Sequence, residues 1–210
     1  MLPKTIETQS MKIIEAELEA RALLAQIDPK HRAIVKRVIH ASADFDFAEN
    51  LVFLRDAYDA GIQALKEQKT IIADTTMILS GISKPALSSL GISADCYVSK
   101  PEVIKQARAS GQTRSKLGIE EAIKSYPDGI YLIGNAPTAL IALVDAIEAG
   151  KAEPALVVAV PVGFVNVIES KEAIERTNTP AIVGRGRKGG STIAVAIINA
   201  LLYELYQRKG

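Results

Sequence analysis

From residue 70 onward, short and continuously apolar runs alternate with turn residues and helical stretches, and this order restricts the possible folds most strongly. The runs are Thr70–Ala73, Ala94–Val98, Ile130–Ile133, Ala155–Val160 and Ala181–Val183. Alternation of this kind predicts parallel strands with helices on both faces of one sheet. Runs that are apolar throughout are typical of strands covered on both sides. We therefore expect an α/β protein, a three-layer α/β/α sandwich with a five-stranded parallel sheet.

The first third of the chain has the pattern of helices that precede this sheet. Apolar residues at helical spacing, among good helix formers, predict a first helix over Ile6–Ile27. Asp28 and Pro29 suit the N-cap and the first position of a second helix, and a third is expected over roughly 54–67. No repeat or linker-like stretch divides the chain, so we expect a single domain over residues 1–210.

The last predicted helix, Thr192–Tyr206, has apolar residues nearly all the way round. A helix of this kind is buried on more than one side. Because one sheet covers only one side of a terminal helix, we expect part of it, or a neighbouring helix, to contact a second copy of the chain.

The composition argues against several classes of function. Of the 210 residues, 48% are hydrophobic and 23% charged, which suits a large core. A net charge of +1 gives no general attraction for nucleic acid or membranes. Cys96 is the only cysteine, which excludes an internal disulfide and a multi-cysteine zinc site. His31 and His40 fall on opposite faces of one predicted helix and cannot share a metal. With no signal peptide and no uncharged run of ~18 residues, a cytoplasmic protein without a bound metal is expected.

The segment that follows the last strand, residues 184–191, is the most conspicuous candidate for a binding site. In open parallel sheets, ligands bind beyond the carboxyl ends of the strands. The Gly-x-Gly-x-x-Gly spacing of this segment superficially matches a dinucleotide fingerprint, but no further strand follows that could bind a ribose. Backbone N–H groups at a helix start, with Arg185, Arg187 and Lys188, indicate phosphate or carboxylate binding. The alternative is a basic, solvated turn.

Three further residues have two interpretations each. His40 lies near the end of the second helix, off its apolar stripe and beside Arg37. It is either a surface imidazole at a helix C-terminus or a proton donor. Asn135 follows a strand and either caps the next helix or offers its amide to a ligand. Arg114 pairs either with a substrate carboxylate or with Glu120 or Glu121.

Six segments in register together resemble the precorrin-8X methylmutase family of cobalamin biosynthesis. They are residues 37–41 (RVIHA), 74–77 (DTTM), 113–115 (TRS), 134–140 (GNAPTAL), 161–171 (PVGFVNVIESK) and 185–191 (RGRKGGS). The resemblance runs nearly from end to end. It implies a flavodoxin-like fold and a homodimer with active sites near the subunit interface. It also implies an isomerase that moves a methyl group from C-11 to C-12 of a corrin precursor, giving hydrogenobyrinate or its cobalt form.

The resemblance also assigns residues to a site. The family's catalytic histidine corresponds to His40, and no cofactor or resident metal is implied. One departure is visible, because Glu7 stands where the family has an aromatic residue in the first helix. The family's motifs and the post-strand edge together give the expected substrate contacts: Ser10, Arg37, Asp74, Thr76, Arg114, Asn135, Gly163, Arg185, Arg187, Gly189 and Ser191.

The chemistry of the residues fits this resemblance. The substrate is an anionic tetrapyrrole, and a nearly neutral protein binds it through locally concentrated donors. A 1,5-methyl shift requires polarisation of the conjugated ring, and protonation by a general acid polarises it. General acid catalysis typically raises a rate by ~10²–10⁴-fold. Asn166 slightly favours the cobalt form. Two alternatives remain, a non-catalytic tetrapyrrole carrier on the same scaffold and a nucleotide-binding regulator that holds a phosphate at residues 184–191.

Overall fold

The five apolar runs form five parallel strands. In the computed structural model, which describes residues 3–206, the parallel strands are β2 (Ile71–Ala73), β3 (Ala94–Asp95), β4 (Ile130–Ile133), β5 (Leu156–Ala159) and β6 (Ala181–Gly184). Their order across the sheet is β3-β2-β4-β5-β6. With the parallel strands counted from one, this is the 2-1-3-4-5 order of flavodoxin-like folds. The predicted α/β class is confirmed.

The prediction of five strands was wrong by one. A sixth strand, β1 (Leu51–Leu54), pairs antiparallel with β6 at the edge of the sheet. The helix expected from Leu54 is α4 (Ala57–Lys66), and it begins only after Arg55 and Asp56, which both have positive φ angles of 53° and 52°. No glycine or proline marks this turn, so the pattern of the sequence did not separate the strand from the helix.

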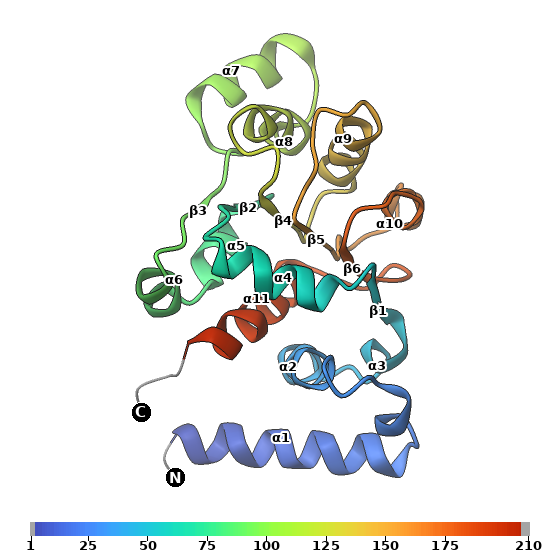
Figure 1. The fold of residues 1–210 in the computed structure, drawn as a ribbon. Coiled ribbons are helices and arrows are strands. Elements are labelled where there is room, and N and C mark those ends of the chain that lie inside the picture. Colours follow the sequence, from blue (N-terminus) through green and yellow to red (C-terminus); the bar gives the residue numbers. More distant parts are fainter. Residues whose placement is uncertain (1–2, 207–210) are drawn as a thin grey trace.

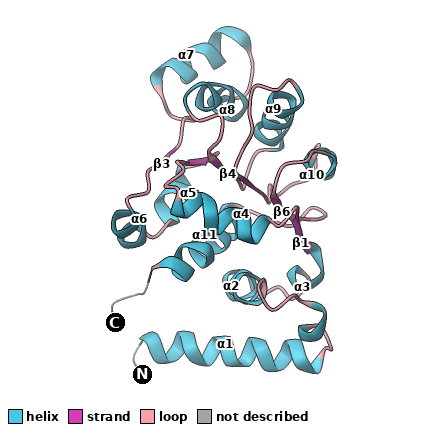
Figure 2. Ribbon diagram, viewed as in Figure 1, coloured by secondary structure: helices cyan, strands magenta, loops and turns pink. Residues whose placement is uncertain are grey.

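Helices cover both faces of the sheet (Figures 1 and 2). Alternate strand residues point to opposite faces, so Ile72, Tyr131 and Val157 belong to one core, and Ile71, Ile130 and Leu156 to the other. The first core is covered by α7 (Pro101–Ser110), α8 (Arg114–Ser125), α9 (Pro137–Glu148) and α10 (Val167–Arg176). The second is covered by α4, α5 (Thr76–Gly81), α6 (Lys84–Leu90) and α11 (Ser191–Leu205).

The N-terminal helices form further layers beneath α11. They are α1 (Pro3–Ala20), the 3-10 turn η1 (Leu24–Gln26), α2 (Arg32–Ser42) and α3 (Phe47–Asn50). The second helix begins later than predicted, because residues 29–31 form a turn in which Asp28 Oδ1 accepts the Lys30 N–H at 2.9 Å. The first helix ends earlier than predicted, before Ala22, whose φ angle is 57°.

The apolar surface of α11 is used within the chain. One side of α11 lies on the sheet, and α2 packs against another side, with α1 beneath α2 (Figure 1). Ile193, Ile197 and Leu201 of α11 share one continuous core with Ile34 and Val38 of α2. The premise that the sheet alone covers α11 was therefore wrong, and contact of α11 or a neighbouring helix with a second copy of the chain stays a prediction.

Candidate functional site

A cavity of about 370 Å³ opens between the last turn of α2 and the first turns of α5 and α11. Since α5 follows β2 and α11 follows β6, the cavity lies at the carboxyl edge of the sheet, where the fold predicts a ligand. Three residues expected from the sequence share its lining, although they are distant along the chain. The lining residues are Arg37, His40, Ala41, Met77, Gly81, Ser191, Thr192, Val195, Ala196 and Asn199.

His40 lies exposed in the last turn of α2, and Arg37 lies one turn earlier on the same side. Arg37 is held from two directions. Its Nη2 is 3.3 Å from Glu7 Oε1 on α1, and its guanidinium carbon is 4.9 Å from the centre of the Tyr203 ring on α11. The glutamate at the departure from the family pattern is thus an ion-pair partner of a cavity arginine.

Asp74 occupies the point where the strand order reverses, between β2 and β4. Its carboxylate is 2% exposed and accepts the backbone N–H groups of Gly134, Asn135 and Ala136 at 3.0, 2.9 and 2.8 Å. Burial raises the pKa of the Asp74 carboxyl, and these backbone donors oppose that rise. Asp74 therefore holds the turn before α9, and its oxygens are used within the fold.

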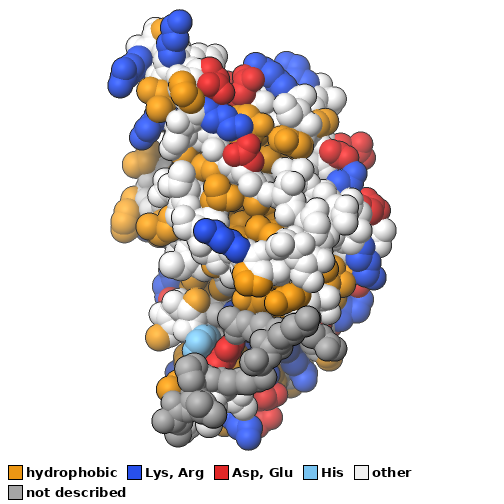
Figure 3. All heavy atoms as spheres, turned by 90° about the vertical axis from the view of Figure 1, so that its left-hand side faces the viewer, with side chains coloured by type: hydrophobic (Ala, Val, Ile, Leu, Met, Phe, Trp, Pro, Cys, Tyr) orange, Lys and Arg blue, Asp and Glu red, His pale blue; other side chains and the backbone are white. Residues whose placement is uncertain are grey.

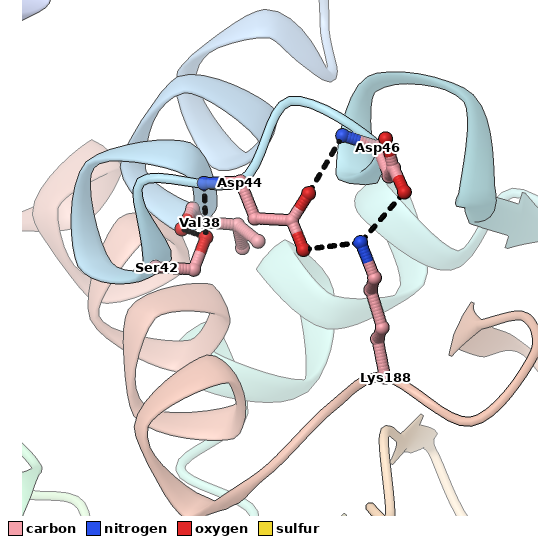
Figure 4. A network of polar contacts seen from close by, with 5 residues as sticks. All are labelled: Val38, Ser42, Asp44, Asp46 and Lys188. Carbon is pink, nitrogen blue, oxygen red and sulfur yellow. Dashed lines mark hydrogen bonds and ion pairs between the residues drawn. The ribbon is translucent and has the colours of Figure 1, made fainter.

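The loop of residues 185–190 carries three cations, which have different surroundings. Arg185 forms a bidentate pair with Glu175, at 3.0 and 2.9 Å. Lys188 Nζ lies 2.6 Å from both Asp44 and Asp46 (Figure 4). The guanidinium carbon of exposed Arg187 is 5.7 Å from the centre of the Phe164 ring, and it forms no ion pair within residues 3–206. Two of the cations expected to bind an anion are thus already paired.

Lys171 supports this loop from beneath and was not singled out as a site residue from the sequence. It is 2% exposed, and its Nζ donates to the carbonyl oxygens of Gly186 and Lys188 at 2.8 and 2.9 Å. Burial lowers the pKa of Lys171 to about 8. Its position within the conspicuous 161–171 segment is the signal that pointed to it.

The end of the loop lies against Val160, the residue that follows β5. Gly189 has a φ angle of 158°, and a Cβ there would lie 2.2 Å from the carbonyl oxygen of Val160. The next residue, Gly190, donates its N–H to the same oxygen at 2.8 Å. The loop therefore fixes the start of α11, where Ser191 Oγ lies 3.0 Å from Thr75 Oγ1.

Other expected residues lie outside the lining of the cavity. Ser10 is on α1, where its Oγ donates to the Ile6 carbonyl oxygen at 2.9 Å. Thr76 and Arg114 are exposed at the first positions of α5 and α8, and the Asn135 side chain is exposed before α9. Gly163, with φ 144°, follows β5 and donates its N–H to the Arg187 carbonyl oxygen at 3.3 Å. Apart from Ser10, they follow the carboxyl ends of strands or begin the next helix.

Seven of the ten lining residues were not recognised as such from the sequence, Met77 and Asn199 among them. Met77, 63% exposed, forms part of an apolar wall at the start of α5. Asn199 is a polar residue in the middle of the mostly apolar α11, which was the available signal. Its amide accepts the Ser83 N–H at 2.9 Å and donates to the Gly81 carbonyl oxygen at 3.0 Å, so it joins α11 to the end of α5.

Within the part of the chain that the structure describes, no three His, Cys, Asp or Glu side chains form a group that could hold a metal ion. None of the helices in residues 3–206 is long and apolar enough to cross a membrane. His31 is away from the cavity, stacked on Phe53 with 3.7 Å between the ring centres.

A sheet of flavodoxin-like order, with a histidine and an arginine beside a cavity at its carboxyl edge, defines an α/β protein with a candidate site for a small molecule. The family model for precorrin-8X methylmutase matches residues 5–204, and the chain belongs to this family. The cobalt-precorrin-8 methylmutase of Salmonella typhimurium is 44% identical over 97% of this chain and 96% of its own length. The precorrin-8X methylmutase of Pseudomonas aeruginosa is 36% identical over 90% of this chain and 91% of its own.

A solved structure agrees with these relatives. The crystal structure of precorrin-8X methyl mutase from Thermus thermophilus superimposes with a TM-score of 0.87 at 39% identity, covering 95% of this chain and 94% of that one. The chain is therefore a methylmutase, an isomerase that moves a methyl group, and its role is in cobalamin biosynthesis.

Proposed function

We propose that this methylmutase acts on cobalt-precorrin-8, moving the methyl group from C-11 to C-12 to give cobyrinate, with His40 as the general acid. The observation that carries the proposal is the single cavity lined by His40, Arg37 and Ser191. The choice of the cobalt form is supported by curated relatives of that name at up to 44% identity, against 39%, 36% and 30% for proteins named precorrin-8X methylmutase. Cobalt enters here as part of the substrate.

The reaction is an isomerisation, so the bond from the methyl group to C-11 breaks as the bond to C-12 forms. No electrons are gained or lost overall. A proton donated by His40 draws electron density from the conjugated system and lowers the barrier to migration. In the cobalt-free substrate, a ring nitrogen accepts this proton and returns it to His40 after the methyl group has moved. In the cobalt form the nitrogen lone pairs bind the metal, so a carbon of the conjugated path takes the proton and returns it to His40.

The carboxylates of the substrate require cations that are unpaired or, like Arg37 with Glu7, held only by a partly exposed ion pair. Arg37 in the cavity, with Arg114 and Arg187 near the same edge of the sheet, are the proposed partners. The proposal omits Asp74, because its carboxylate is buried and occupied by backbone donors. Arg185 is assigned a smaller part, since its Nε and Nη2 groups already donate to the two carboxylate oxygens of Glu175.

A homodimer is part of the proposal because one chain encloses too little space. The cavity of about 370 Å³ is near the lower end of the range of ~300–1,000 Å³ for drug-sized ligands. A tetrapyrrole with acetate and propionate groups is larger than these. Phe164 and Val165 are 85% and 76% exposed, and Figure 3 shows apolar side chains gathered over the middle of one face. A second copy that covers such surfaces would supply the missing wall.

Two measurements test this function. Cobalt-precorrin-8 and its cobalt-free form are each added to a small amount of enzyme without oxygen, and the corrin chromophore is followed by absorbance. We expect many equivalents of product per chain and a higher kcat/KM for the cobalt form. Product limited to one equivalent would support the carrier, and a preference for the cobalt-free form would overturn the proposed substrate.

Sedimentation tests the assembly separately. A species of twice the 22.5 kDa chain mass is expected at micromolar concentration, and a monomer there would contradict the homodimer. The cytoplasmic location expected from the sequence remains a prediction.

A further inference from the structure

We propose that Lys188 is a positioning residue, which ties the segment after α2 to the loop before α11 and so sets the place of His40 in the cavity. This inference rests on the proposed role of His40. It replaces the expectation that Lys188 belongs to a cradle for a substrate anion.

The contact joins parts of the chain that are far apart in sequence. Lys188 Nζ lies 2.6 Å from a carboxylate oxygen of Asp44 and 2.6 Å from one of Asp46 (Figure 4). The pairing raises the pKa of Lys188 and lowers that of Asp44, through the hydrogen bond between them. One ammonium between two carboxylates leaves a local excess of negative charge. A substrate carboxylate would be repelled there, so this lysine is unsuited to bind one.

The two aspartates belong to a hydrogen-bonded unit that ends α2. Ser42 Oγ donates to the Val38 carbonyl oxygen at 2.8 Å and accepts the Asp44 N–H at 3.2 Å (Figure 4). The Asp46 N–H donates to Asp44 Oδ1 at 3.0 Å. Because His40 lies in the same final turn of α2, a displacement of this unit would displace the imidazole with it.

The other end of the contact is fixed. The backbone oxygen of Lys188 accepts a hydrogen bond from buried Lys171 at 2.9 Å. Gly189 lies against Val160, and Ser191 lines the cavity only three residues after Lys188. Lys188 thus reaches from an immobilised loop at one wall of the cavity to the helix end that forms the opposite wall.

The first test uses the substrate-free protein, so its outcome does not depend on the reaction. The chain has only two histidines, which makes the imidazole proton signals in an NMR spectrum easy to assign. We expect Lys188→Met, and separately Asp44→Asn, to shift the ring signals of His40. The signals of His31, which stacks on Phe53, are the internal reference and should stay in place.

The second test is kinetic. Misplacing a general acid lowers the rate of the reaction more than it weakens ground-state binding. Lys188→Met should therefore reduce kcat about tenfold, while the product Kd changes less than about twofold. Lys188→Arg should restore most of the rate, since a guanidinium can also bridge two carboxylates. Lys69→Met is the matched control, because Lys69 also pairs with two acids, Glu67 at 3.9 Å and Asp128 at 2.5 Å.

The Asp44→Asn variant distinguishes the two interpretations of Lys188, because they predict different changes in kcat and in product binding. If Lys188 positions His40, then Asp44→Asn lowers kcat, and the double variant with Lys188→Met is no slower than either single one. If Lys188 binds the substrate, Asp44→Asn frees the ammonium and tightens product binding. Unchanged His40 signals in Lys188→Met, or product binding weakened tenfold at constant kcat, would overturn the inference. Absence of turnover in the wild type would overturn the proposed function and not the inference about Lys188. The NMR shifts of His40 would still test whether Lys188 positions that residue.

Discussion

The guanidinium of Arg37 lies 3.3 Å from the carboxylate of Glu7, so a residue near the start of the chain reaches an arginine that lines the cavity. The two side chains are 26% and 32% exposed, which places the pair between the surface and the interior. An anionic substrate therefore meets Arg37 with a carboxylate already beside it. This relationship makes Glu7 a competitor of the substrate for the same cation.

Glu7→Gln should consequently tighten binding of the corrin product. A partly exposed ion pair contributes ~0.2–1 kcal/mol, so the expected gain in affinity is about fivefold at most. Titration followed by absorbance measures it. Glu15→Gln is the matched control, because Glu15 also joins α1 to α2, through Lys36 at 3.2 Å. Weaker product binding in Glu7→Gln would show that Glu7 orients Arg37 and does not compete for it.

Asp74→Ala should unfold at a much lower urea concentration than the wild type. The change leaves three backbone N–H groups, those of Gly134, Asn135 and Ala136, without their acceptor. Each unsatisfied buried donor costs ~1–3 kcal/mol, so the free energy of unfolding falls by about 3 kcal/mol or more. Asp74→Asn retains one acceptor oxygen and should lose less. If Asp74→Asn kept its stability but bound product ten times more weakly, Asp74 would be a substrate contact after all.

Lys171 should make stability depend on alkaline pH. Its pKa is lowered by burial to about 8 in the folded chain, whereas the ordinary value is 10.5. Between these values the unfolded chain holds a proton that the folded chain has released, so the free energy of unfolding gains a contribution that rises with pH. The neutral amine keeps two N–H donors for the carbonyl oxygens of Gly186 and Lys188.

Urea unfolding of the wild type and of Lys171→Met, compared from pH 7 to pH 10, measures this contribution. The advantage of the wild type over the variant should grow above about pH 8 and be constant below it. Lys124→Met, at a side chain that is 69% exposed, controls for the loss of a lysine. An advantage that stays constant or shrinks as the pH rises would contradict the assignment.

Arg187→Ala and Arg185→Ala should weaken product binding unequally. Arg187 forms no ion pair within residues 3–206 and is available to a carboxylate, so its loss should cost about tenfold in affinity. Arg185 is occupied by Glu175, and its loss should have a smaller effect. Added salt should weaken the wild-type complex more than that of Arg187→Ala. Equal effects of the two substitutions, or displacement of the product by ATP, FMN or NAD, would contradict this assignment.

The sequence predicted the parallel part of the sheet because each of its strands is a continuous apolar run between turn residues. It did not predict β1, because the run Leu51–Leu54 is short and passes into α4 through Arg55 and Asp56, which are not typical of a turn with positive φ. The start of α2 was predicted too early, because the Asp28 side chain caps a turn and not the helix itself.

The candidate site was predictable in position but not in its pairing of charges. The strand order brings Ser191 to the same edge as the segment after β2, and the helix packing adds His40 and Arg37. Which cations stay free depends on contacts between distant segments, such as Lys188 with Asp46, 142 residues apart. No local pattern encodes such a contact. The same holds for Asp74, whose partners belong to the turn after β4, the next strand across the sheet, and not to its own segment.

The rate of methyl migration in His40→Ala tests the central claim most directly. A general acid contributes ~10²–10⁴-fold, so the variant should form the corrin chromophore at least about a hundred times more slowly, with a product Kd within about tenfold of the wild type. His31→Ala, at the other histidine, should keep the wild-type rate. Turnover by His40→Ala at more than about a tenth of the wild-type rate would show that His40 is not the acid.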